Sequence, residues 1–355
     1  MLLAAAFSLL LASRPTLDLA TMLPLGLISF WGFAQLALGS TVYRYATLDA
    51  AVRFASYGAA GLLAAQALHD RSQPDSQPDR WMRWFSWFGA AVALVSVLAY
   101  YTSPEKLLWL VASRYPDNWG PFESRNNFAQ FLELAFPVAM YRLKGTKAPD
   151  SDRVWVCGLL AAAIFAAGLA SASRAGSVLL TLEALWLGLV LFRGDGKRMG
   201  IFATAALGLV LAMGTGTLLG RLKQSDPLSM RREIFESAWS MTRAHPWTGF
   251  GLGTFAAVYP EYARFDPGSR VDHAHNDWLE WSAEGGVGLA GVWLALAVAL
   301  IRRAVRSIWG LGVVAVLLHA TVDYPFARFG VAVWFFALWG MLAVSGRELS
   351  GGSRL

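Results

Sequence analysis

The sequence has little charge, one cysteine and five histidines in 355 residues. Only 15% of its residues are charged and 56% are hydrophobic, and a soluble protein needs more polar surface than this composition supplies. The single Cys157 lies in an apolar run, which excludes a disulfide framework or a thiolate metal site built from this chain alone. The first residues lack the basic region and small-residue cleavage site of a removable signal peptide, so we expect none.

Long apolar segments recur along the whole chain. A helix needs about 20 apolar residues to cross about 30 Å of hydrocarbon, and most of the segments approach this length. The sequence therefore predicts an all-α polytopic membrane protein, a bundle of about eleven or twelve transmembrane helices. The eleven apolar segments are 1–13, 19–39, 46–69, 81–101, 125–143, 154–172, 175–192, 199–219, 286–305, 307–322 and 329–345.

One long polar stretch, residues 220–285, interrupts this pattern and holds three of the five histidines. We expect it to be a large extracytoplasmic loop that contains short helices. The sequence then divides into N-terminal transmembrane helices (1–219), the extracytoplasmic loop (220–285) and C-terminal transmembrane helices (286–355), all within a single integrated membrane domain.

The distribution of basic residues predicts the orientation of the chain. When the short loops are assigned alternately to the two sides, one side carries sixteen Lys and Arg residues and the other carries six. The positive-inside rule makes the first side cytoplasmic, so Arg125, Arg174, Asp323 and the long loop fall outside. The net charge of +6 does not indicate nucleic-acid binding, because the basic residues are scattered among short inter-helix loops.

Arginines on the predicted outer side are candidates for an anion site. Arg174 lies in a turn of small residues, where its planar guanidinium could pair with phosphate oxygens. The alternative is an interfacial arginine that snorkels. Arg231 and Arg232 begin a predicted helix over 230–239, where cations oppose the helix dipole, which favours a positional role over a role in stabilising the helix. A solvated basic patch is the alternative interpretation. The apolar face predicted for this helix consists of Ile234, Phe235, Ala238 and Trp239.

The loop ends in a cluster that includes Asp272, His273, His275 and Asn276. Histidine suits proton transfer near neutral pH, so these side chains are candidates for acid–base chemistry. A His-x-His pair with flanking aspartates could also bind a metal, although neither a His-Glu-x-x-His helix nor a cysteine partner accompanies it. A purely structural pair of interfacial histidines is the third interpretation.

Two further segments carry histidine. His245 is followed by three alternating glycines; because no strand precedes them, they indicate a tight turn that shapes the loop rather than a dinucleotide site. His319 lies near the end of an apolar segment, four residues before Asp323. An ionisable residue there is a functional candidate, and helix capping by Asp323 with chain reversal at Pro325 is the structural alternative.

Taken in order, these segments resemble the O-antigen ligase and polymerase superfamily of bacterial envelope enzymes. The resemblance covers about residues 120–330. It rests on the run Arg125-Asn126-Asn127-Phe-Ala-Gln-Phe-Leu-Glu133 with Pro137, on Ser173-Arg174-Ala-Gly-Ser177, on Arg231-x-x-Ile-Phe, on His245-Pro-x-x-Gly-x-Gly-x-Gly-x-Phe255, on His275-Asn276-x-x-Leu279 and on His319-x-x-x-Asp323-x-Pro325.

The resemblance implies an O-antigen ligase-like glycosyltransferase with a helical membrane fold of the glycosyltransferase C type. Such an enzyme would move a glycan, with inversion, from an undecaprenyl-diphosphate carrier to a hydroxyl of lipid A core or of another saccharide. It would work without metal or cofactor at the periplasmic face of the bacterial inner membrane.

In this interpretation Arg174 and Arg231 hold the donor diphosphate and His275 acts as general base. We expect Asn276 and Asp272 to orient the histidine. The predicted substrate-binding residues are Arg125, Asn126, Asn127, Arg232, His245, Asp272, His273, Asn276, His319 and Asp323.

Other functions remain open at this level. A polymerase of O-antigen or exopolysaccharide and a protein O-oligosaccharyltransferase would use the same donor chemistry. From a different class, a secondary transporter or lipid-linked-sugar flippase would also need many spans, but it predicts charges near the bilayer midplane and paired inverted halves. The sequence instead concentrates its charges at one face and has no internal symmetry.

Overall fold

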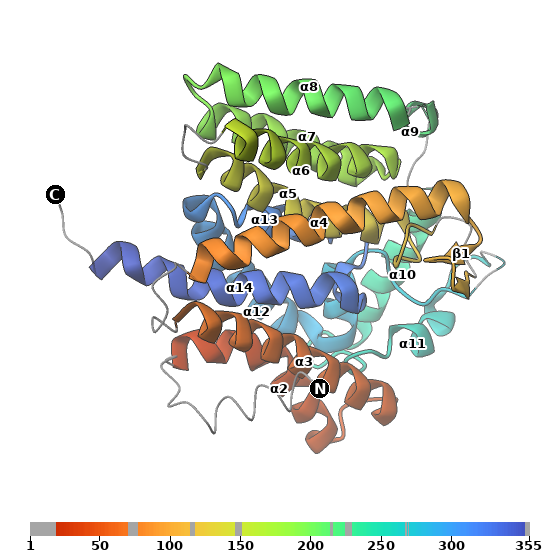
Figure 1. The fold of residues 1–355 in the computed structure, drawn as a ribbon. Coiled ribbons are helices and arrows are strands. Elements are labelled where there is room, and N and C mark those ends of the chain that lie inside the picture. The colour runs from red at the N-terminus through yellow and green to blue at the C-terminus, as the bar shows by residue number, and fades with distance from the viewer. Residues whose placement is uncertain are drawn as a thin grey trace. The chain divides into compact units, whose positions relative to one another are not determined.

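The structure is a computed structural model that describes residues 19–69, 77–113, 118–145, 151–213, 216–223, 229–266, 268 and 270–351. It confirms an all-α polytopic membrane protein. Every predicted apolar segment from 19–39 onward contains a helix, and the segment 1–13 lies outside the described residues. The helices (Figure 1) are α2 Leu19–Leu38, α3 Arg44–His69, α4 Gln77–Thr102, α5 Arg125–Gly145, α6 Ser151–Ala170, α7 Arg174–Leu191, α8 Gly196–Met213, α9 Gly216–Leu222, α10 Ser229–Ala244, α11 Phe255–Tyr262, α12 Asp277–Ser307, α13 Leu311–His319 and α14 Phe329–Gly351.

Besides these α-helices, the described residues form only short elements of secondary structure. A 3-10 helix, η1, spans Pro325–Ala327, and two short antiparallel strands, β1 Lys106–Leu107 and β2 Val111–Ala112, follow α4. The predicted helix within the polar loop is confirmed as α10, and α9 and α11 are further short helices near and within that loop.

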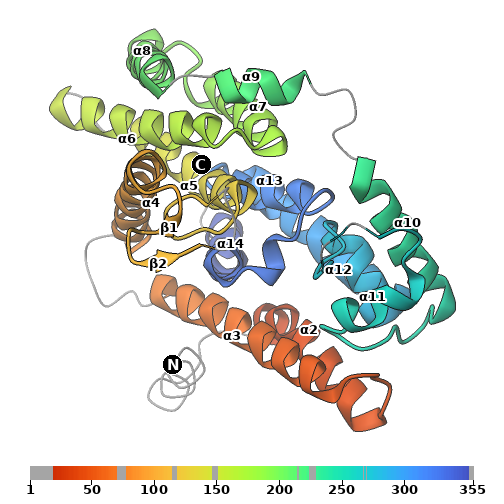
Figure 2. The ribbon, with the colours of Figure 1, turned by 90° about the vertical axis from the view of Figure 1, so that its right-hand side faces the viewer.

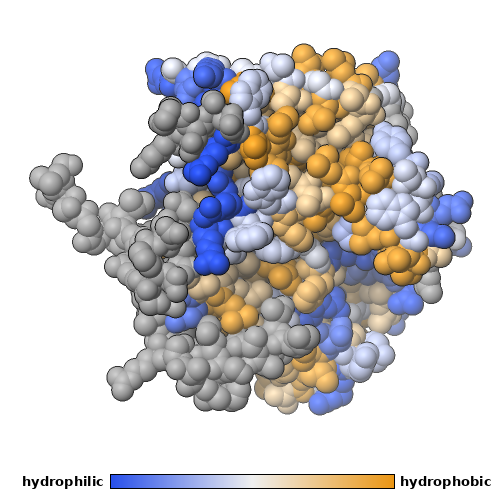
Figure 3. Space-filling view, in the orientation of Figure 1, coloured by the Kyte–Doolittle hydropathy of each residue, from blue (hydrophilic) through white to orange (hydrophobic). Residues whose placement is uncertain are grey.

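Five of the described helices are long and apolar enough to cross a membrane: α4, α6, α7, α8 and α12. These helices also expose apolar side chains on their outer surfaces. On α4, for example, the exposed apolar residues include Trp84, Trp87, Phe88, Leu94 and Leu98. Hydrophobic residues cover much of the face drawn in Figure 3. Exposed apolar surface of this extent is expected where the solvent is lipid.

The chain divides into two compact units. Unit 1 comprises Met1–Asp70, Asp226–Arg303 and Ala320–Leu355, and unit 2 comprises Arg71–Ser225 and Ala304–His319. In unit 1, α3 packs against α2 and α14. The approach of α14 is close because Gly340 lies against the backbone of Gly61, where a Cβ would collide with the carbonyl oxygen.

Unit 2 is built around α5, which α4, α6, α7 and α13 surround. Every side chain from Asn127 to Met140 is buried, so α5 is the interior helix of this unit. It is not among the five apolar helices because polar side chains, including Gln130 and Glu133, line it from its first turn to its third.

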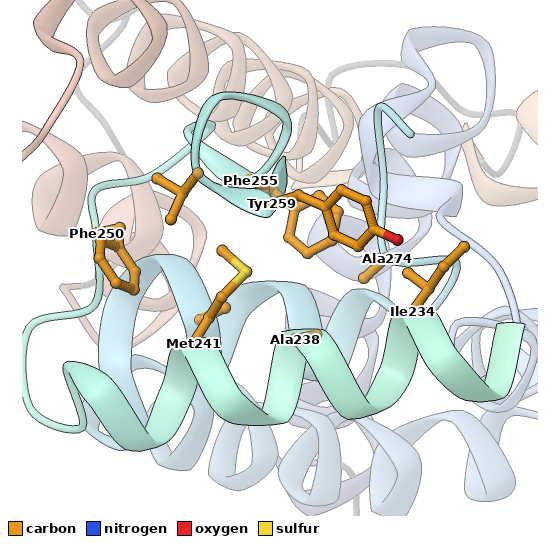
Figure 4. Packing of buried hydrophobic residues seen from close by; sticks show 9 residues of the cluster. Ile234, Ala238, Met241, Phe250, Phe255, Tyr259 and Ala274 are labelled. Atoms are coloured by element: carbon orange, nitrogen blue, oxygen red, sulfur yellow. The ribbon is translucent and has the colours of Figure 1, made fainter. Parts of the chain in front are cut away.

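The polar loop has its own hydrophobic core in unit 1. Figure 4 shows Ile234, Ala238 and Met241 of α10 pointing toward Phe255 and Tyr259 of α11. Figure 2 shows α10 and α11 side by side. The loop is therefore a folded subdomain rather than an irregular connection.

The apolar face predicted for α10 was wrong at Trp239. Ile234 and Ala238 are buried as expected, but Trp239 is 51% exposed and Met241 occupies the buried face. A helix turns about 100° per residue, so Met241 points almost in the direction of Ile234, whereas Trp239 is rotated by about 140° from it.

Candidate active site

The first turns of α12 carry three buried carboxylates, Asp277, Glu280 and Glu284. Their spacing places them on neighbouring parts of one helix face. Asp277 accepts a hydrogen bond from the backbone N–H of Phe326 at 3.2 Å, and Glu280 accepts one from that of Ala274 at 2.7 Å. Each carboxylate thus fixes the backbone of a different segment beside the start of α12.

Glu284 fixes the glycine-rich turn that the sequence predicted. Its two carboxylate oxygens accept hydrogen bonds from the backbone N–H groups of Gly253 at 2.7 Å and Phe255 at 2.8 Å. Gly249, Gly251 and Gly253 all have positive φ, which only glycine adopts at little cost. The alternating glycines therefore shape a turn, as expected.

Gly286 breaks α12 just after this carboxylate. Its φ is 72°, and a Cβ there would meet the Trp247 carbonyl oxygen at 2.3 Å. The apolar segment predicted to begin at residue 286 follows this break, while the helix itself begins at Asp277. The final polar cluster of the loop and the next membrane segment therefore form one kinked helix.

His275 lies immediately before α12 in a strained backbone conformation. Its φ of 52° is in the left-handed region, which costs a non-glycine residue about 1–3 kcal/mol. The side chain is 32% exposed, and its Nδ1 lies 3.3 Å from Oδ1 of Asp323, which is 2% exposed. A buried carboxylate that accepts a hydrogen bond from Nδ1–H leaves Nε2 as the basic nitrogen of the imidazole.

We predicted from the sequence that Asn276 and Asp272 orient His275, but in the structure both side chains have other partners. The Asn276 side chain instead accepts a hydrogen bond from the Leu279 N–H at 3.1 Å and so caps α12. Asp272 is half exposed and forms an ion pair with Arg270 at 2.7 Å. The contact that holds His275 comes from Asp323, 48 residues along the chain.

Tyr324 connects the two neighbouring histidines. Its ring stacks on His273 with centroids 4.5 Å apart and meets His275 edge-on at 4.8 Å. His273 Nδ1 lies 2.9 Å from Glu280, so this histidine is held by a second carboxylate. The guanidinium of Arg328 lies over the Tyr324 ring, with its central carbon 5.1 Å from the centre of the ring.

Arg231 reaches the same segment from α10. Its guanidinium donates a hydrogen bond to the carbonyl oxygen of Val322, the residue before Asp323. Unit 1 therefore brings together three predicted residues, Arg231, His275 and Asp323, around the 322–324 segment. An always-charged cation next to a histidine–carboxylate pair can bind an anion beside a site of proton transfer.

In unit 2, Arg174 is the first residue of α7 and follows a tight turn. Ser173 caps the helix by accepting a hydrogen bond from the Gly176 N–H at 3.2 Å, and its hydroxyl donates to Asn126 at 2.8 Å. Ala172 has a φ of 54°, another non-glycine residue in the left-handed region. The starts of α7 and α5 are therefore joined at the residues that the sequence singled out.

Arg125, the first residue of α5, has cationic neighbours. Arg221 and Arg174 both repel its charge, and all three side chains are partly buried. Cations gathered at two helix starts form an environment suited to a multiply charged anion. Arg221 was absent from the predicted site, because a lone arginine at the end of a short helix carries no sequence signal.

The remaining predicted residues are placed differently. Arg232 is exposed, and His245 follows the C-terminal end of α10, about 21 Å along the axis from Arg231. The His245 ring packs on Phe250 at 4.3 Å. Asn127 and His319 are buried in unit 2 at 2% and 1% exposure, so a substrate does not reach them without movement.

The sequence reasoning missed Tyr324, Glu280 and Glu284. The Asp277-x-x-Glu280-x-x-x-Glu284 spacing, which repeats at the helical period, was the available signal. Among the described residues, three or more His, Cys, Asp or Glu side chains nowhere gather in an arrangement that could hold a metal ion.

A polytopic helical membrane protein with an arginine beside a histidine–carboxylate pair has the parts of a group-transfer enzyme. The comparison with protein families agrees. Residues 159–294 match the family model described as O-antigen ligase, and this match supports the superfamily predicted from the motifs.

The match includes Arg174, Arg231 and His275 and ends before Asp323. Members of this family are glycosyltransferase-like enzymes. A search of curated proteins found no match to the chain.

Proposed function

We propose that this protein is an O-antigen ligase-like glycosyltransferase. It moves a glycan from an undecaprenyl-diphosphate carrier to a hydroxyl of lipid A core or of another saccharide, at the periplasmic face of the bacterial inner membrane. The observation that carries the proposal is the arrangement in unit 1, where the His275–Asp323 pair lies beside the Arg231 guanidinium. The O-antigen ligase match over the same α10–α12 region supports it.

The proposed reaction is a single displacement with inversion. Asp323 holds the proton on Nδ1 of His275, so Nε2 takes the proton of the acceptor hydroxyl as its oxygen attacks the anomeric carbon. The bond from that carbon to the diphosphate oxygen breaks, and its electron pair stays on the diphosphate. Arg231 stabilises the negative charge that grows there.

Arg174 is assigned to the donor diphosphate from the family pattern and from its place at a helix start among cations. Its guanidinium would provide paired hydrogen bonds to phosphate oxygens that a lysine could not reproduce. Replacement by lysine should therefore impair transfer, even though the charge is kept.

The test is glycan transfer from a lipid-linked donor by variants with normal expression in the membrane. Arg174→Ala and Arg231→Ala should each lose at least about 100-fold in rate, the scale of a lost transition-state donor. Arg243→Ala, at the exposed end of the same α10 helix, is the matched control and should keep its activity. Full activity of Arg231→Ala would refute the assignment, and complete loss on adding a chelator would show that a metal takes part.

Product analysis separates the members of the class. A glycan attached to lipid A core identifies a ligase, longer glycans on the carrier identify a polymerase, and a glycosylated protein identifies an oligosaccharyltransferase. Movement of intact lipid-linked sugar across the membrane without a new glycosidic bond would overturn the proposal in favour of a flippase.

A further inference from the structure

Unit 2 contains ionisable side chains that the proposed mechanism does not use. Glu133 of α5 is 0% exposed, Glu183 of α7 is 4% exposed and His319 of α13 is 1% exposed. Nδ1 of His319 lies 2.7 Å from Oε1 of Glu133. We propose that Glu133, Glu183 and His319 form a proton-binding centre inside the membrane.

The three helices meet at this centre. α5, α7 and α13 pack against one another in pairs. α13 crosses α5 at Glu133 itself, since Gly312 lies so close that a Cβ would collide with the Glu133 carbonyl oxygen. Glu183 is close enough to Glu133 for their charges to interact.

The centre lies deep in the membrane-spanning part of unit 2. The starts of α5 and α7 are joined through Asn126 and Ser173, so both helices enter from the same end. Glu133 is about 12 Å and Glu183 about 13 Å along its helix from that end, at 1.5 Å per residue. The hydrocarbon core is about 30 Å thick, which places both carboxylates near its middle.

The surroundings offer little to stabilise ionised carboxylates. Both oxygens of Glu183 and Oε2 of Glu133 are buried without a hydrogen-bond partner among the described residues. On α7, Glu183 occupies the buried stripe between Leu180 and Leu187, where packing alone would favour another leucine. Without hydrogen-bond partners or a counter-ion, a buried carboxylate of this kind is strongly disfavoured when ionised and is stable when it carries a proton.

The charged groups on the surrounding helices lie toward the helix ends. Apart from the thiol of Cys157 in α6, the described parts of α4, α5, α6, α7 and α13 bury three acidic or basic side chains. These are Glu133, Glu183 and His319. Charge neutrality then requires one proton on Glu183 and one shared between Glu133 and His319. Among the side chains of these helices that the structure describes, the other charged ones are Arg80 and Arg83 of α4, Arg125, Arg142 and Lys144 of α5, Arg153 of α6 and Arg174 of α7.

A polar stripe on α5 connects the centre to the helix start. Asn127 donates from its amide to Gln130 at 2.9 Å, and Gln130 precedes Glu133 by one turn; all three side chains are buried. Amide side chains do not relay protons themselves, but such a polar stripe offers hydrogen bonds to water molecules that would carry a proton between the arginine-rich end of unit 2 and the centre. We therefore expect the centre to exchange its proton with solvent in the folded protein.

The test is infrared difference spectroscopy of the full chain in lipid nanodiscs at pH 7, with and without D₂O. The wild type should show the carbonyl band of a protonated carboxylic acid that disappears in Glu183→Gln and shifts in D₂O. The control Glu261→Gln, an exposed carboxylate of α11, should leave the band unchanged.

Every outcome decides the proposal. If the difference between the wild-type and Glu183→Gln spectra contains only bands of ionised carboxylates, the proton-binding centre is refuted. If those bands also depend on sodium, the three side chains form a cation site instead. An acid band that never shifts in D₂O overturns the exchange. Failure of Glu183→Gln to fold also counts against the proposal, because the amide copies the shape of a protonated acid and not the charge of a carboxylate.

Discussion

The substitution Asp323→Asn tests the geometry around His275 while keeping the shape of the side chain. Asp323 is 2% exposed and accepts a hydrogen bond from the Nδ1–H of His275 in the proposed tautomer. An asparagine amide that donates at this position would force Nδ1 to accept and would move the imidazole proton to Nε2. The nitrogen that faces the acceptor hydroxyl would then no longer be a base.

The size of the effect follows from this contact. A hydrogen bond to a charged group contributes about 1.5–3 kcal/mol. At 1.36 kcal/mol for each factor of ten, this loss alone slows transfer about 10- to 150-fold. Complete loss of general base catalysis would slow it about 10²- to 10⁴-fold. The loss should be in kcat rather than in KM, because the base acts in the transition state.

The assay is glycan transfer from a lipid-linked donor by purified protein in liposomes, with Asp272→Asn as the comparison. Asp272 is half exposed and pairs with Arg270, so its replacement should cost far less than that of Asp323. Equal losses in the two variants, or an Asp323→Asn protein as active as the wild type, would refute the role of Asp323.

Two stability predictions concern the loop. Met241→Ala should lower the free energy of unfolding by about 2–5 kcal/mol, whereas Trp239→Ala should change it by less than about 0.5 kcal/mol, because Met241 is buried in the α10–α11 core and Trp239 is half exposed. Glu284→Ala should cost at least about 2 kcal/mol through the lost hydrogen bonds to Gly253 and Phe255. Thermal unfolding in detergent measures all three variants; equal transitions for Met241→Ala and Trp239→Ala would contradict the core described for α10, and a wild-type transition for Glu284→Ala would contradict its role in the turn.

The membrane helices could be predicted from the sequence because apolar runs of sufficient length have few alternatives to a helix in lipid. The start of α12 could not, because its first turns carry acidic residues. These appear polar in sequence but are buried once Asp277 and Glu284 bind backbone N–H groups. The helix begins where Asn276 caps it, nine residues before the predicted apolar segment.

The candidate site was only partly predictable. The residue types of Arg231 and His275 indicated anion binding and proton transfer without any structure. The partner of His275 was not identified, since Asp323 lies 48 residues away and adjacent asparagine and aspartate residues offered a nearer choice. Long-range pairing is fixed by how α10, α12 and the 320–328 segment pack, which local sequence does not specify.

The central claim is that His275 is the base of a glycosyl transfer, and His275→Ala tests it most directly. The purified variant, reconstituted in liposomes with a lipid-linked glycan donor and a saccharide acceptor, should lose at least about 100-fold in transfer rate, while its thermal unfolding stays close to that of the wild type. Wild-type transfer by a folded His275→Ala protein would contradict the account.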